Sequence, residues 1–64
     1  MTRDQFIVHL ADTVNHTDNI VYEKILAWSL SWISTDTLNR LARDKVRELP
    51  EGDPIREIVE KGIQ

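Results

Sequence analysis

Cysteine is absent from this chain, and glycine occurs only twice, at Gly52 and Gly62. A disulfide scaffold and a thiolate zinc site both require cysteine, so neither can form. Two glycines so far apart also exclude a glycine-rich phosphate loop. The longest apolar stretch, Ile20–Ile33, contains charged and hydroxyl side chains and is shorter than the ~20 residues that a membrane-spanning helix needs. These absences exclude the disulfide-rich and membrane-spanning classes of protein.

The N-terminus lacks the apolar run of a secretory signal, because Thr2, Arg3 and Asp4 follow Met1 directly. We therefore expect a soluble, cytoplasmic protein, and the start at Met1 leads us to expect a complete short reading frame. Of the 64 residues, 41% are apolar and 30% are charged, and the formal net charge is −3. This composition is too apolar for intrinsic disorder, and the length allows one small helical domain over residues 1–64.

Apolar residues at helical spacing predict four short helices joined by brief loops, which is an all-α bundle of three or four helices. Two of the helices have strong start signals. The first is expected over about Arg3–Val14, because Thr2 and Gln5 have the spacing of a capping box. The last is expected to begin at Pro54, with Asp53 as its N-cap.

The two middle helices have less distinct boundaries. The second is expected over about Asn19–Ile33, after a polar turn in which Thr17 or Asp18 provides the N-cap. The third is expected to begin within Ser34–Asp36 and to end at Pro50, because the residue before a proline is pushed out of the helical region.

The second predicted helix is apolar around more of its circumference than a surface helix should be, so we expect it to be the central and most buried element. Its broad face carries Val21, Tyr22, Ile25, Leu26, Trp28, Trp32 and Ile33. Ile20 and Leu30 point away from that face. The alternative for Trp28–Trp32 is a strand, since apolar residues alternate there with serines. The length of the pattern and the lack of a partner strand favour the helix.

The aromatic residues are the most informative feature of the sequence. All of them lie within the first 33 residues, whereas thirteen of the nineteen charged residues lie in the second half. Four short helices have little interior for so many large side chains, and tryptophan and tyrosine are enriched in protein interfaces. We therefore expect a protein interface, most simply that of a homodimer, formed by Ile20, Tyr22, Trp28, Leu30 and Trp32.

A second surface is basic. Arg40, Arg43 and Arg47 form a stripe on the outer face of the third helix, which is a pattern typical of nucleic-acid contacts. Asp36 and Asp44 each lie four residues from Arg40, so the stripe is also interpretable as a solvated face with ion pairs along it. The preceding turn lacks the glycine of a helix-turn-helix DNA-binding unit, which makes nucleic acid the less favoured partner.

Catalytic and metal-binding residues are scarce. His9, Asp12 and His16 fall on one face of the first helix, but their spacing is not that of a recognised metal motif. Each serine has a plainer place on a helix or at its cap, and so short a chain has little scaffold with which to enclose a substrate. We therefore expect no enzyme activity, no cofactor and no resident metal.

These observations together predict a small non-enzymatic regulator or adaptor that acts by binding another protein and that self-associates. A chain this short and without recognised motifs would suit an accessory protein of a phage or mobile element, or an inhibitor of a larger protein. The alternative is a nucleic-acid-binding regulator that uses the basic face of the third helix. The sequence resembles no family that would decide between these functions.

Overall fold

The computed structural model describes residues 1–64 throughout, as an all-α fold without strands. The elements are α1 (Arg3–His16), α2 (Ile20–Leu30), α3 (Thr35–Lys45), the 3₁₀ turn η1 (Val46–Glu48) and α4 (Pro54–Lys61). The predicted four-helix, all-α architecture is confirmed, and the strand alternative for Trp28–Trp32 is wrong. No helix combines the length and the apolar character needed to cross a membrane.

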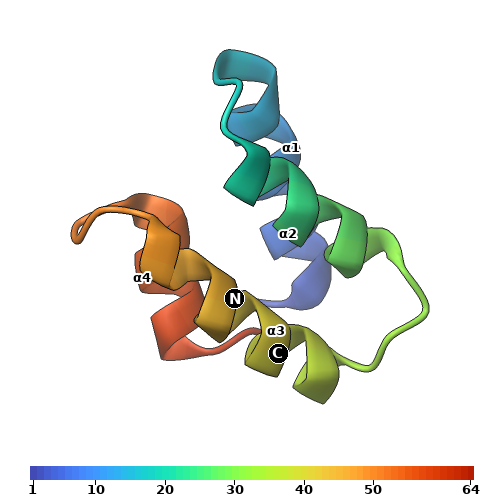
Figure 1. The fold of residues 1–64 in the computed structure, drawn as a ribbon. Coiled ribbons are helices and arrows are strands. Elements are labelled where there is room, and N and C mark those ends of the chain that lie inside the picture. Colours follow the sequence, from blue (N-terminus) through green and yellow to red (C-terminus); the bar gives the residue numbers. More distant parts are fainter.

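The helices pack as two pairs. Figure 1 shows α1 beside α2 in one half of the molecule and α3 beside α4 in the other. α2 also packs against α3, and α1 packs against α4, so the two pairs enclose one core. η1 continues the direction of α3 and brings the chain to the exposed turn before α4.

The two strong start signals are confirmed. The Thr2 hydroxyl accepts a hydrogen bond from the backbone N–H of Gln5, whose side chain accepts in return from the Thr2 backbone, so the capping box is complete. Asp53 caps α4 by accepting from the backbone N–H groups of Ile55 and Arg56, and Pro54 occupies the first turn. Side-chain oxygens thus satisfy backbone donors that no helical carbonyl can reach.

The boundaries of the middle helices differ from the expectation. Asn19 rather than Thr17 or Asp18 is the N-cap of α2, because its side chain accepts from the N–H of Val21. At the other end, α2 stops at Leu30 instead of continuing to Ile33. The Ser31 hydroxyl and the Ser31 N–H both donate to the carbonyl of Trp28 and close the last turn there, which is the competition with the helical ladder that serine offers.

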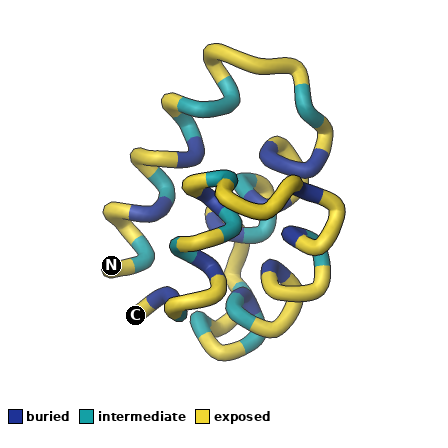
Figure 2. The backbone as a smooth tube through the Cα atoms, turned by 90° about the vertical axis from the view of Figure 1, so that its left-hand side faces the viewer, coloured by how far each residue is buried: buried dark blue, intermediate teal, exposed yellow.

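The core contains twelve buried apolar side chains drawn from every helix, from η1 and from the segments that follow η1 and α4. They are Phe6, Leu10, Val21, Tyr22, Ile25, Leu38, Ala42, Val46, Leu49, Ile55, Val59 and Ile63. α2 supplies more buried residues than any other helix, in agreement with its predicted central place. Figure 2 shows these positions turned inward along each helix, with the exposed positions on the outside.

The N- and C-terminal segments of the chain are hydrogen-bonded to each other. The Arg3 N–H donates to the carbonyl of Gln64, and the Gln64 N–H donates to the carbonyl of Met1. Asn39 of α3 fixes the same segment, because its amide group both donates to the carbonyl and accepts from the N–H of Ile63. Figure 2 shows the N- and C-termini close together at one side of the molecule. Ile63 is thereby held in the core.

Candidate functional site

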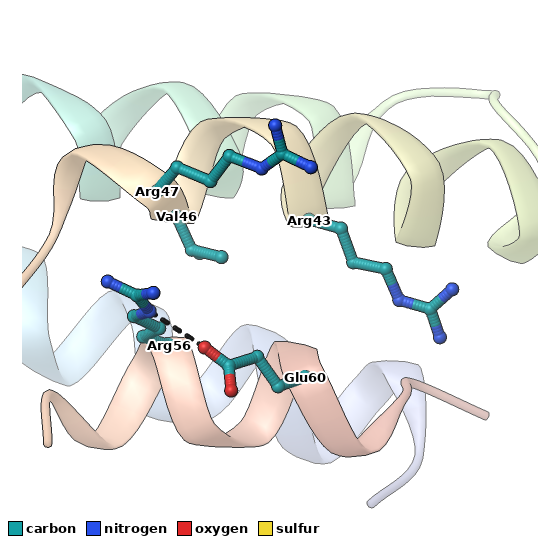
Figure 3. A pocket seen from close by; sticks show the side chains of 5 residues that line it. All are labelled: Arg43, Val46, Arg47, Arg56 and Glu60. Atoms are coloured by element: carbon teal, nitrogen blue, oxygen red, sulfur yellow. Dashed lines mark hydrogen bonds and ion pairs between the residues drawn. The ribbon is translucent and has the colours of Figure 1, made fainter. Parts of the chain in front are cut away.

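A hollow of about 380 Å³ lies between α3 and η1 on one side and α4 on the other. We call it the arginine cleft, because its lining consists of Arg43, Val46, Arg47, Arg56 and Glu60. Figure 3 shows two of the arginines coming from the α3 side and the third, with Glu60, from α4. Three guanidinium groups and one carboxylate make this cleft positive in a chain whose net charge is −3.

Arg56 is the fixed member of the arginine cleft. Its Nε donates to Glu60 Oε1 at 2.7 Å, and its Nη1 donates to the backbone carbonyl of Leu49 at 2.8 Å. Only 23% of the Arg56 side chain is exposed, so the guanidinium is held against the protein. Its Nη2 makes no hydrogen bond within the fold, and this leaves one donor edge for another molecule.

Arg43 and Arg47 are the free members of the arginine cleft. Both are exposed, and neither forms an ion pair or a side-chain hydrogen bond within the chain. Their spacing of four residues places them on the same side of the helical turn. Arg43 extends toward the carboxyl end of α4, where its Nη2 lies 3.7 Å from the position that a Cβ on Gly62 would occupy. The donors of both guanidinium groups are available to a ligand.

The arginines of the predicted basic stripe therefore do not all line the arginine cleft. Arg40 is exposed but does not line the arginine cleft, and it pairs with neither Asp36 nor Asp44. The expectation of ion pairs along this face is wrong for these residues. Arg56 also lines the cleft, although it was not predicted from the sequence. Only the packing of α4 beside α3 and η1 places it in the same lining as Arg47. Arg47 and Arg56 belong to different elements separated by a turn, so helical spacing could not have revealed that they line one cleft.

A second surface is apolar and lies where α2 meets α3. Trp32 is fully exposed there, and Leu30 is 65% exposed. We call these two residues the apolar corner. The expectation that Trp32 belongs to the buried face of the second helix is wrong, because the helix ends two residues earlier.

The backbone of the apolar corner is held by Arg3. The Arg3 guanidinium donates to the carbonyls of Ser29, Ser31 and Ile33 at 3.1, 3.0 and 2.6 Å, and also to the Thr35 hydroxyl. These acceptors begin in the last turn of α2 and end at the first residue of α3. The indole of Trp32 is thus presented to solvent by a loop whose conformation is fixed on its inner side.

The remaining predicted interface residues separate into two groups. Ile20 is 66% exposed at the start of α2 and is available to a partner. Tyr22 is buried and Trp28 is half-buried against the core of the same chain. The core therefore covers the Tyr22 side chain and part of the Trp28 side chain within the monomer.

Tyr22 also links α2 to α4 through a polar contact. Its hydroxyl donates to Oδ2 of Asp53, the same carboxylate that caps α4 through Oδ1. The hydrogen bond to Asp53, followed by burial and the nearby negative charge, raises the pKa of Tyr22 to about 12. The hydroxyl is a permanently neutral donor at physiological pH, so this contact is structural and not acid–base chemistry.

His9, Asp12 and His16 are all exposed on α1, and the structure contains no group of three potential ligands suited to a metal ion. His16 Nδ1 lies 2.7 Å from the carbonyl of Asp12 and 3.8 Å from its carboxylate. These contacts are those of a helix C-terminus. A second, open hollow beside α1 is lined by Met1, Gln5, Val8 and His9. Its lining contains no acidic residue.

The molecule thus offers two surfaces with unused binding capacity, the arginine cleft and the apolar corner. They differ in chemistry, because one presents guanidinium donors and the other presents an indole and an aliphatic side chain. Comparison with protein-family models, with curated proteins and with solved structures finds no match to this chain.

Proposed function

We propose that this protein is a small non-enzymatic adaptor or regulator that acts through protein–protein contact, with the apolar corner as its contact surface. The observation that carries the proposal is the full exposure of Trp32 on a loop fixed by Arg3. Tryptophan dominates the binding energy of many interfaces, and its burial removes a large apolar area from water. Because Arg3 already fixes the backbone of this loop, the loop loses little freedom when a partner covers the indole.

The exposed face of α2 supports self-association as the simplest form of this contact. Ile20 and Leu30 lie at its two ends, and the exposed residues between them are Glu23, Lys24 and the small Ala27. A two-fold axis near the middle of the helix would place Ile20 of one copy against Leu30 of a second copy, and the reverse contact would form at the same time. Ala27 would permit close approach of the two helices. Trp32 lies just beyond Leu30 and would extend the apolar area.

Sedimentation equilibrium of the purified chain tests this proposal. Leu30→Lys and Trp32→Ala should each weaken the dimer by at least about tenfold while the helical circular-dichroism signal is retained, because both residues are exposed in the monomer. Val8→Lys is the matched control, since Val8 is equally exposed, at 69%, but lies on α1. A soluble monomer at high concentration, with no partner recovered through Trp32, would contradict the proposal.

A nucleic-acid-binding regulator is the second candidate, and the observation that favours it is the lack of any ion-pair partner for Arg40, Arg43 and Arg47. Titration with DNA and RNA across a range of salt concentrations distinguishes it. Binding through several phosphates releases counterions, so the affinity should fall steeply with salt. A weak affinity with a shallow salt dependence would exclude this candidate.

A further inference from the structure

We propose that the arginine cleft is a binding site for a single phosphate monoester dianion. This inference goes beyond the proposed protein contact, because the cleft lies between α3 and α4, whereas the apolar corner lies at the end of α2. Guanidinium groups suit this ligand, since each can donate two parallel hydrogen bonds to a pair of phosphate oxygens. Three of them line one hollow here.

The site is partly organised before a ligand arrives. Arg56 is anchored at Nε and Nη1 by Glu60 and by the carbonyl of Leu49, so its unused Nη2 edge keeps its place beside the hollow. Arg43 and Arg47 have no competing partners and supply the mobile donors that can close on the ligand. The apolar Val46 lies between them in the lining and offers no competing acceptor. A ligand would therefore meet one fixed guanidinium and two adjustable ones.

The surrounding charges favour one compact anion over a long polyanion. Arg40 does not line the cleft, and the exposed Asp44 follows Arg43 in the sequence. Glu48 forms an ion pair with Lys45 at 2.8 Å. The arginines that line the hollow therefore form a cluster and not a long row that could hold successive phosphates. A nucleic-acid backbone gains its affinity from several such contacts in a row. A terminal monoester needs only one, and it carries nearly two negative charges above its second pKa of about 6.

Glu60 is the acidic residue in the lining of the arginine cleft, and it allows a specific test of the proposal. Its carboxylate already occupies Nε of Arg56 and places a negative charge in the lining. The Glu60 carboxylate repels an incoming phosphate, and the attraction of the arginines must exceed this repulsion. A phosphate monoanion is attracted less strongly by the arginines than a dianion, because it carries less charge. Removing the carboxylate should therefore tighten phosphate binding, even though it removes an ion pair from the free protein.

The experiment is a titration with inorganic phosphate at constant ionic strength, followed through the side-chain Nε–H resonances of the arginines. Arg43→Gln and Arg47→Gln should each lower the association constant about fivefold, and Glu60→Gln should raise it by a similar factor. Arg40→Gln is the matched control, because it removes the same charge from the same helix but outside the cleft, and it should leave binding unchanged. Thermal unfolding of each variant verifies the fold.

Two further probes identify the form in which the phosphate arrives. A peptide bearing one phosphoserine should bind through the same arginines, and its unphosphorylated form should not. An oligonucleotide with only internal diesters should bind more weakly than the phosphopeptide. The proposal is overturned if Arg40→Gln weakens binding as much as Arg43→Gln, if Glu60→Gln fails to strengthen it, or if the oligonucleotide binds more tightly. None of these outcomes depends on the apolar corner, so they are independent of the proposed protein contact.

Discussion

The Arg3 side chain forms hydrogen bonds with more residues than any other side chain of the protein. Arg3 begins α1, yet its guanidinium donates to acceptors between Ser29 and Thr35, and its own backbone N–H donates to Gln64. The carbonyls of Ser29 and Ser31 are among the groups that a helix leaves unsatisfied at its C-terminus, and the carbonyl of Ile33 lies in the loop that follows. α2 has no basic residue in its last turn, so a cation from another helix supplies the donors.

Replacing Arg3 with alanine should lower the free energy of unfolding by about 1–3 kcal/mol, because several carbonyls lose charged donors at once. Arg3→Lys is the informative comparison. Lysine keeps the charge but has no planar fork with which to reach three carbonyls, so it should recover less than half of the loss. Urea unfolding measures both variants, and a lysine variant as stable as the original protein would show that charge alone is sufficient.

The raised pKa of Tyr22 predicts a stability change in alkaline solution. Because the hydrogen bond to Asp53 favours the neutral phenol, the pKa of about 12 in the folded protein lies above the value of 10.0 for a free tyrosine. The stabilisation is therefore complete below pH 10 and is lost as the pH rises toward 12. Urea unfolding of the original chain and of Tyr22→Phe across this range should show a difference that shrinks with rising pH. A constant difference would contradict the linkage.

At the scale of the helices, the sequence predicts starts better than stops. Side-chain caps are local, so Thr2 with Gln5 and Asp53 with Pro54 were recognisable from their spacing alone. Ser31 closes the last turn of α2, and the loop that follows is held by Arg3, which lies 26 residues before the first carbonyl that it reaches. Apolar periodicity extended the predicted helix to Ile33, although the structure uses the residues after Leu30 as a loop. The arginine cleft depends in the same way on a contact between separate helices.

Asp53 shows how a local cap also joins two helices. Its two carboxylate oxygens accept from the N-terminus of α4 and from the Tyr22 hydroxyl of α2. Asp53→Ala should lower the free energy of unfolding by about 1–3 kcal/mol, since it removes a cap and also leaves the buried hydroxyl without its acceptor. In the Tyr22→Phe background the same change should cost only the part due to the cap. Equal losses in both backgrounds, measured by urea unfolding, would show that the two contacts are independent.

At the scale of the whole molecule, two helix pairs share one small core, and both candidate surfaces consist mainly of side chains outside it. Trp32, Arg43 and Arg47 are exposed, so substitutions at these positions should leave the core intact. The helical spacing of the arginines predicted one basic stripe and the distribution of the aromatic residues predicted one interface, and the fold rearranges both. Arg56 replaces Arg40 in the basic surface, while Tyr22 passes from the interface into the core.

The paired ends of the chain have a topological consequence. The Gln64 N–H donates to the carbonyl of Met1 and the Gln64 carbonyl accepts from the Arg3 N–H, so a short peptide linker between the two ends would close the backbone into a ring with little distortion. Ring closure restricts the unfolded ensemble and should stabilise the fold by about 4 kcal/mol, by the loop-closure relation. A linear chain carrying the same linker residues is the control, and thermal unfolding compares the two. In such a ring the exposed turn at Gly52, where a side chain would meet no neighbouring atom, becomes the natural position for new ends.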